Sequence, residues 1–148
     1  MLFEKLKMER SLNLKKYPDF VKYQLPVLLW MAFIFGLSSV PGYDLEPIEF
    51  PYAHLIAHSL LYATLCALLF RALRFQHFSK LLSSASYVFS FLLVAAYGAS
   101  DEYHQSFVPG RMEELKDFLI DVTSALVVLI IIFLVTKLRA NKSKLESV

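Results

Sequence analysis

Apolar residues occur in four long blocks that polar and charged residues separate. Four stretches carry no Asp, Glu, Lys or Arg: residues 23–43, 50–70, 81–100 and 122–136. The hydrocarbon core of a bilayer is about 30 Å thick, and a helix rising about 1.5 Å per residue needs about 20 residues to cross it. The first three stretches have 21, 21 and 20 residues, so each predicts a transmembrane helix.

The fourth stretch has 15 residues, which is too short to cross the bilayer. Its helix is therefore expected to begin upstream and to carry Asp121, and with a longer extension Asp117, to the membrane edge. We predict an all-α membrane protein in which four transmembrane helices form a small bundle over residues 23–137.

The composition agrees with a membrane protein and excludes several other classes. Of the 148 residues, 57% are hydrophobic and 19% are charged, whereas soluble domains average about 45–50% and about 25%. These values exclude a disordered tail, a collagen-like repeat and a disulfide scaffold. The single cysteine, Cys66, cannot form an internal disulfide. The net charge of +2 gives no reason to expect a nucleic-acid partner.

The positive charges predict the orientation of the helices. Of the 15 Lys and Arg residues, 13 lie before the first stretch, between the second and third, or after the fourth. Because cytoplasmic segments are enriched in Lys and Arg, both termini are expected in the cytoplasm and the loops 41–52 and 101–117 outside it. The basic segment 1–22 is a candidate for a helix on the membrane surface, and the basic tail 138–148 is expected to be cytoplasmic.

Polar residues recur at helical spacing in three of the predicted helices. Three sets each share roughly one helical face: His54, His58, Tyr62 and Cys66; Tyr97, Asp101, His104 and Gln105; and Asp117, Asp121 and Ser124. Glu102 is expected to point elsewhere, as part of a solvated helix end. Ionisable groups at membrane depth cost a few kcal/mol each unless they meet partners. The three polar faces are therefore expected to meet in a pocket that opens outward.

A tight turn is predicted between the third and fourth helices. Pro109 presets the φ of the first corner, and Gly110 supplies the positive φ of the second. Arg111 follows this turn and is expected to fold back toward the carboxylates. Its planar guanidinium matches a carboxylate or a pair of phosphate oxygens.

The run from Ser100 to Arg111, SDEYHQSFVPGR, followed by Asp117 and Asp121, resembles the signature of the VanZ-like family of small bacterial membrane proteins. Residues 29–41 are similar to the family's first span, and His58 followed by Tyr62 is similar to part of its second. The chain departs from the family pattern at His54 and Asp121, where Asp and Asn are frequent. The resemblance implies a four-helix protein of the bacterial plasma membrane. The family's named member is linked to resistance against the glycopeptide antibiotic teicoplanin.

The first of three functional hypotheses is a binding role in the cell envelope. The pocket would engage the headgroup of a membrane lipid, a lipid-linked cell-wall precursor or an amphiphilic glycopeptide antibiotic. In this role Arg111 clamps an anion, the histidines carry or donate protons, and the carboxylates accept hydrogen bonds. The candidate ligand-binding residues are His54, His58, Tyr62, Asp101, Glu102, His104, Gln105, Arg111, Asp117 and Asp121.

The second hypothesis is a membrane-embedded hydrolase acting on a lipid phosphoester, with catalytic candidates His58, Asp101, Glu102 and His104. His54 and His58, four residues apart, could also hold a divalent metal ion with Asp101 or His104. Because no H-E-x-x-H motif is present, the sequence by itself assigns no cofactor. The third hypothesis is structural: a buried network that only fixes the helix register. Separately, His54 and His58 could simply lie at headgroup depth, where amphipathic rings are common.

Overall fold

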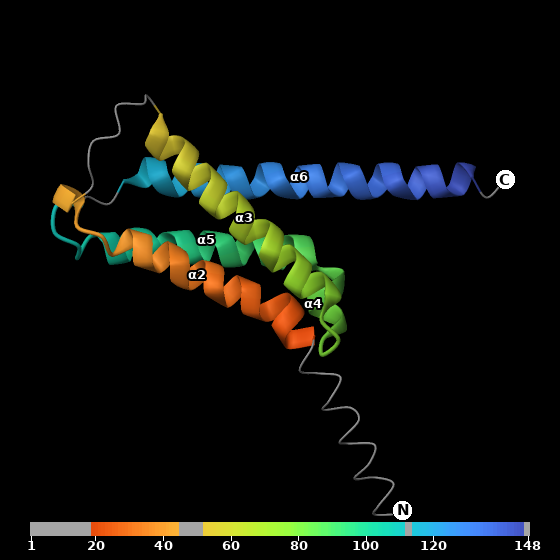
Figure 1. Cartoon of the computed structure of the whole chain (residues 1–148). Coiled ribbons are helices and arrows are strands. Elements are labelled where there is room, and N and C mark those ends of the chain that lie inside the picture. Colours follow the sequence, from red (N-terminus) through yellow and green to blue (C-terminus); the bar gives the residue numbers. More distant parts are fainter. Residues whose placement is uncertain (1–18, 45–51, 112–113, 147–148) are drawn as a thin grey trace, which may run out of the picture.

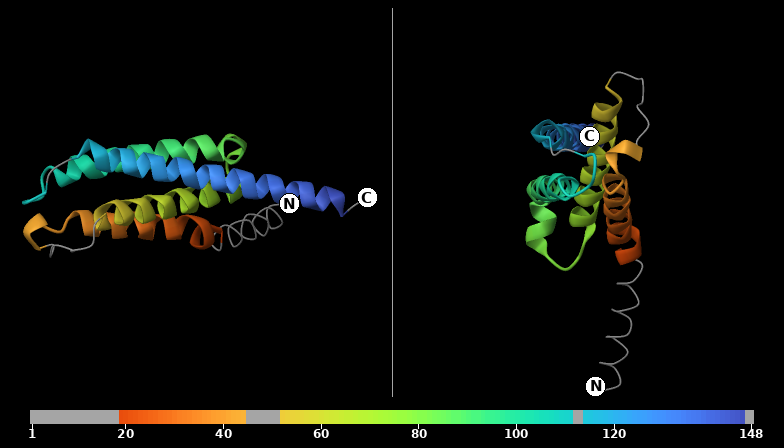
Figure 2. Two further views of the ribbon diagram at one scale, coloured as in Figure 1. Left: turned by 90° about the horizontal axis from the view of Figure 1, so that it is seen from above. Right: turned by 90° about the vertical axis from the view of Figure 1, so that its left-hand side faces the viewer.

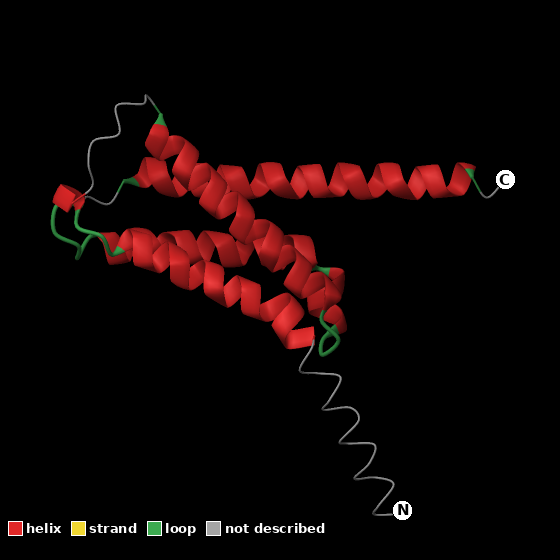
Figure 3. Ribbon diagram, viewed as in Figure 1, coloured by secondary structure: helices red, strands yellow, loops and turns green. Residues whose placement is uncertain are grey.

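The computed structural model describes residues 19–44, 52–111 and 114–146, and within these ranges the chain is helical with no β-strand (Figure 3). The helices in chain order are η1 (Phe20–Gln24), α2 (Leu25–Ser38), η2 (Gly42–Asp44), α3 (Ala53–Phe75), α4 (Lys80–Ser84), α5 (Ser86–Gln105) and α6 (Leu115–Leu145). The all-α fold class is confirmed. Most of the predicted surface segment 1–22, and part of the loop 41–52, lie outside the described residues.

Among the described residues, three helical segments are long and apolar enough to cross a membrane, where the sequence predicted four. They are Phe20–Ser38, Ala53–Phe75 and Leu115–Leu145. The predicted third span at 81–100 is divided at Ala85 into α4 and α5. Serine hydroxyls in α4 bond to nearby carbonyl oxygens, Ser83 to Arg74 and Ser84 to Leu81. The Ser84 bond is local and competes with a continuous helix, whereas the Ser83 bond ties α4 to the end of α3.

The prediction that the last helix begins upstream of its apolar stretch is confirmed. Helix α6 begins at Leu115, so that Asp117 lies in its first turn and Asp121 one turn later. It then runs to Leu145, well beyond the other helices (Figure 1). This upstream start brings two carboxylates into the packed part of the bundle.

Helix α3 is central to the packing because it contacts α2, α5 and α6 (Figures 1 and 2). Fully buried side chains from three helices meet along it: Tyr62 and Leu65 of α3, Val94 of α5 and Ala125 of α6. Helix α2 is tied to this group by hydrogen bonds. The Trp30 Nε1 donates to the Leu61 carbonyl at 2.9 Å, and the Tyr97 hydroxyl donates to the Met31 carbonyl.

Large apolar side chains cover the outside of the bundle rather than its interior alone. Leu29, Leu60 and Ile131 are each at least half exposed and come from α2, α3 and α6. An apolar exterior is unfavourable in water and favourable against lipid chains. The pattern of exposure therefore agrees with a helical bundle embedded in a membrane.

Four helix ends meet at one end of the bundle, which we call the loop end. They are the C-terminal ends of α2 and α5 and the N-terminal ends of α3 and α6, at the left of Figure 1. The start of α2 and the end of α6 lie at the opposite end (Figures 1 and 2). The ionisable residues predicted to form a site belong to the helix turns at the loop end.

The predicted turn at Pro109 and Gly110 is confirmed. The Arg111 N–H donates to the Val108 carbonyl at 3.1 Å, and Gly110 has φ of +74°. The turn is held against η2, because the Gly42 N–H donates to the Pro109 carbonyl at 3.0 Å. A Cβ atom on Gly42 would collide with the Gly110 carbonyl oxygen, so this contact requires glycine.

Candidate functional site

A buried carboxylate, Asp101, joins three helices at the loop end. Its Oδ2 accepts hydrogen bonds from Ser38 of α2 at 2.8 Å, from the Tyr62 hydroxyl of α3 at 3.1 Å and from Gln105 of α5 at 3.1 Å. All four side chains are buried. We call these residues the Asp101 centre. Three donors on one oxygen hold α2, α3 and α5 in register.

A second buried carboxylate pairs with a histidine across α3 and α6. The His58 Nδ1 lies 3.0 Å from the Asp121 Oδ1, and the Asp121 side chain is fully buried. Because an ionised carboxylate only accepts, Nδ1 is the donor in this hydrogen bond. When the ring is neutral, the Nε2 of His58 is then the nitrogen with a free lone pair.

Glu102 belongs to the same group, contrary to the prediction that it forms a solvated helix end. Its side chain is buried, and its Oε2 accepts a hydrogen bond at 3.1 Å from the Glu114 backbone N–H at the start of α6. Helix α6 covers the side of α5 that the sequence alone left facing solvent. One ligand atom each of His58, Glu102 and Asp121 lies within 4.8 Å of the others. We call these three residues the His58 centre.

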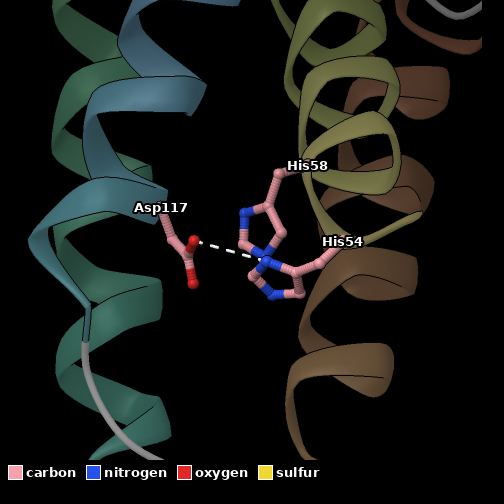
Figure 4. Close-up of side chains that lie close together, drawn as sticks. All are labelled: His54, His58 and Asp117. Atoms are coloured by element: carbon pink, nitrogen blue, oxygen red, sulfur yellow. Dashed lines mark ion pairs between the residues drawn. The ribbon is translucent and has the colours of Figure 1, made fainter. Parts of the chain in front are cut away.

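The outer edge of the His58 centre is formed by His54 and Asp117 (Figure 4). The His54 Nδ1 lies 3.4 Å from the Asp117 Oδ1, and the His54 side chain is 54% exposed whereas that of Asp117 is 7% exposed. Figure 4 shows the carboxylate of α6 facing the two histidine rings of α3, whose centroids are 4.4 Å apart. His58 therefore has the pair of His54, which is exposed, and Asp117, which is buried, on one side and the buried carboxylates of the His58 centre on the other.

Each buried carboxylate of the two centres keeps one oxygen without a hydrogen-bond partner among the described residues. These atoms are Asp101 Oδ1, Glu102 Oε1 and Asp121 Oδ2. The Nε of Arg111 is likewise buried and unpartnered there. Because about 90% or more of buried polar groups in proteins have a partner, three such oxygens at one end of a bundle are unusual.

Two predicted site residues lie against α2 instead of in the His58 centre. The His104 Nε2 lies 3.0 Å from the Ser39 hydroxyl, and its ring stacks on Phe35 with centroids 4.5 Å apart. Arg111 does not fold back to a described carboxylate. Its Nη2 donates to the Leu37 carbonyl at 3.3 Å. The last carbonyls of a helix lack intrahelical donors and carry a partial negative charge, which attracts the guanidinium.

Two grooves on the described surface differ in their lining from the polar, outward-opening pocket that the sequence predicted. One groove runs between α3 and α6 and is lined by Leu55, Ser59, Leu119, Ile120, Thr123 and Ser124. A second, apolar groove between α5 and α6 includes Tyr87, Phe91 and Phe133. Neither groove is lined by the ionisable residues of the two centres. Those side chains pack against one another because α5 approaches closely at Gly98, where a Cβ would lie 3.4 Å from both Tyr62 and Asp121.

The structure changes which residues could hold a metal ion. Two groups have ligand atoms within 4.8 Å of one another: His54, His58 and Asp117, and His58, Glu102 and Asp121. Neither group contains Asp101 or His104, the partners that the sequence suggested for the histidines.

Sequence reasoning also missed Ser38 as a donor to Asp101, and Ser39 as the contact of His104. The signal for both was a pair of serines that ends an apolar run shortly before Pro41.

Comparison with known proteins identifies one family. The sequence model of the VanZ/LLP1 family matches residues 23–136, which is most of the chain. The matched residues include α2, α3 and α5 in full, α6 as far as Thr136, and both centres. Neither the curated proteins nor the solved structures give a match.

Proposed function

The chain belongs to the VanZ/LLP1 family, and on that premise we propose that it binds the polar headgroup of a membrane amphiphile at the His58 centre. The amphiphile is a lipid or a lipid-linked cell-wall precursor, and a glycopeptide antibiotic of the teicoplanin type presents similar chemistry. The binding site lies where α3, α5 and α6 meet at the loop end.

The observation that carries this proposal is the set of unpartnered carboxylate oxygens. A network that served only to fix helix register would be more stable if every buried polar atom in it had a hydrogen-bond partner. Each buried polar group left without one costs about 1–3 kcal/mol of stability. Glu102 and Asp121 each keep one unpartnered oxygen and accept a single hydrogen bond from the protein, whereas Asp101, which also keeps one oxygen unpartnered, accepts three. Hydroxyl or ammonium groups of a headgroup are the donors that would complete these carboxylates.

Arg111 lies at the same end of the bundle and offers a positively charged hydrogen-bond donor, where the carboxylates offer negatively charged acceptors. Its guanidinium is anchored on the Leu37 carbonyl through Nη2, while its buried Nε has no partner among the described residues. A phosphate oxygen is a natural acceptor for this N–H. Together these groups favour a headgroup that carries both a phosphate and hydrogen-bond donors.

The proposal includes an orientation in the membrane of a bacterial cell. Helix α5 acts as the fourth span, alongside the three apolar segments, and the loop end faces the non-cytoplasmic side. The basic residues Lys137, Arg139 and Lys142 near the end of α6 support this orientation, since they lie at the opposite end from the two centres. Fluorescent-protein fusions to the C-terminus are expected to fluoresce, which requires a cytoplasmic location, and alkaline phosphatase fusions there to be inactive.

Native mass spectrometry of the detergent-extracted protein tests the binding proposal. The wild-type chain is expected to retain one phosphate-containing amphiphile, and Glu102→Gln and Asp121→Asn are expected to lose it. His104→Gln serves as the matched control and keeps the ligand, because His104 contacts α2 only through Ser39 and Phe35. Equal retention by the wild type and by both carboxylate variants would remove the basis for this function.

The pairing of His58 with Asp121 supports a second candidate function, hydrolysis of a lipid phosphoester. In this reaction the His58 Nε2 takes a proton from water, the oxygen attacks phosphorus, and the P–O bond to the lipid alcohol breaks. The proton on His58 then passes to the departing alkoxide, while Asp121 orients the ring and stabilises its positive charge. Phosphate release from lipid monophosphates by purified protein, abolished in His58→Gln, is the expected result. Release at the same rate by His58→Gln would exclude this mechanism.

A further inference from the structure

We infer that His58, Glu102 and Asp121 form a binding site for a divalent transition-metal ion such as Zn²⁺. Their three ligand atoms already lie within 4.8 Å of one another and come from three different helices, α3, α5 and α6. In a tetrahedral zinc site with bonds of about 2.0–2.2 Å, ligand atoms are about 3.4 Å apart.

The charge of the site matches a doubly charged ion. Glu102 and Asp121 together carry two negative charges when ionised, and both side chains are buried among apolar helices. Isolated buried carboxylates are strongly disfavoured, whereas two carboxylates with one M²⁺ ion form a neutral unit. The imidazole of His58 favours a transition metal over Mg²⁺ or Ca²⁺, which prefer oxygen ligands.

The unpartnered oxygens are a second, independent sign of a ligand at this place. Asp121 is 0% exposed, and its Oδ2 has no hydrogen-bond partner among the described residues. The same holds for the Oε1 of Glu102, which is 8% exposed. A cation next to these atoms supplies the interaction that the protein does not, with a fourth coordination position left for water or a headgroup oxygen.

The residues at the outer edge provide an access route for the ion. His54, His58 and Asp117 also have ligand atoms within 4.8 Å of one another, and His54 is the exposed member (Figure 4). His58 is common to both groups. An ion captured by His54 and Asp117 can therefore pass to Glu102 and Asp121 without losing contact with His58.

The test uses full-length protein purified in detergent with a tag that contains no histidine, and freed of lipid so that headgroup binding plays no part. Zn²⁺ is added and excess removed, and the metal content is measured by mass spectrometry. We expect about one Zn²⁺ per chain, and a loss of affinity of at least about 100-fold in Glu102→Gln and in Asp121→Asn, since even the partners of metal ligands contribute 10–100-fold. His104→Gln is the matched control and binds as the wild type does.

Cobalt replacement gives a readout that does not depend on the stability of any variant. Wild-type protein loaded with Co²⁺ is expected to show visible absorption of a four- or five-coordinate ion without thiolate charge transfer, because the single cysteine, Cys66, donates its S–H to the Ala125 carbonyl away from this site. A wild-type chain without stoichiometric metal would overturn the inference. So would metal binding that survives Glu102→Gln and Asp121→Asn and is lost only in His54→Gln, which would place the ion at the outer edge. Neither result affects the headgroup experiment, which is read from co-purified amphiphile.

Discussion

The Asp101 centre and the His58 centre are neighbours at the loop end, yet their buried carboxylates differ in the number of hydrogen bonds that they accept from the protein. The Oδ2 of Asp101 receives three hydrogen bonds, from Ser38, Tyr62 and Gln105. Each carboxylate of the His58 centre receives one, Asp121 from His58 and Glu102 from a backbone N–H. All three carboxylates keep one oxygen without a partner among the described residues, so they differ in the number of hydrogen bonds that the other oxygen accepts. The carboxylate with three donors joins helices, and we assign ligand binding to the two that have one donor each. The number of protein donors around a buried acid thus separates a structural role from a binding role.

The largest expected effect follows from removing Asp101, the carboxylate that accepts three hydrogen bonds. Asp101→Ala leaves three buried donors from three helices without an acceptor, at about 1–3 kcal/mol for each. The free energy of unfolding in detergent is expected to fall by several kcal/mol, enough to lower the yield of inserted protein. The milder Asp101→Asn keeps a carbonyl oxygen for these donors and is expected to insert. If Asp101→Ala melts at the wild-type temperature, the Asp101 centre does not hold the bundle together.

A smaller loss of stability is expected at the contact between η2 and the turn at Gly110. A Cβ on Gly42 would collide with the Gly110 carbonyl oxygen, so Gly42→Ala must displace the turn next to Arg111 at a cost of about 1–3 kcal/mol. A Cβ on Gly36, two residues before the end of α2, meets nothing within 4 Å. Gly36→Ala is therefore the matched control and is expected to be neutral or slightly stabilising. Equal melting temperatures for the two variants would contradict the close contact between η2 and the turn.

The smallest expected effect follows from removing one of the three hydrogen-bond donors to Asp101. Tyr62→Phe removes one of the three hydrogen bonds to Asp101 and retains the ring that packs in the core. We expect a decrease of about 1 kcal/mol in the free energy of unfolding, since Ser38 and Gln105 still donate. Retention of amphiphile should be unchanged, because the hydroxyl does not belong to the His58 centre. Loss of amphiphile in Tyr62→Phe would show that the two centres do not act separately.

Features set by local chemistry were predictable from the sequence. The short apolar stretch after Asp121 required a helix beginning upstream, and α6 does begin at Leu115. Likewise, Pro109 and Gly110 determine their turn through their own backbone preferences. The alignment of His58, Tyr62 and Cys66 on a buried face of α3 also follows from helical spacing.

Features set by neighbouring helices were not predictable. Glu102 was expected to face solvent because the periodicity of one helix does not reveal that α6 covers its second side. The pair Ser38 and Ser39 marks the end of an apolar run, but it does not reveal which side chains the hydroxyls contact, since a serine at the end of a helix is common. The destination of Arg111 depended on which helix end lies closest, and the Leu37 carbonyl competes there with the carboxylates. The break at Ala85 coincides with serine side-chain hydrogen bonds, which hydropathy does not record.

The difference between the two centres is tested most directly by melting temperature, measured in detergent with and without a total lipid extract of bacterial membranes. A ligand present at 100 times its Kd stabilises the folded state by about 2.7 kcal/mol, so the wild-type protein is expected to melt higher with lipid. Asp101→Asn should melt lower than the wild type but keep the lipid-dependent increase, and Asp121→Asn should melt near the wild type but lose that increase. Loss of the increase in Asp101→Asn, or its persistence in Asp121→Asn, would contradict the assignment of structure to one centre and binding to the other.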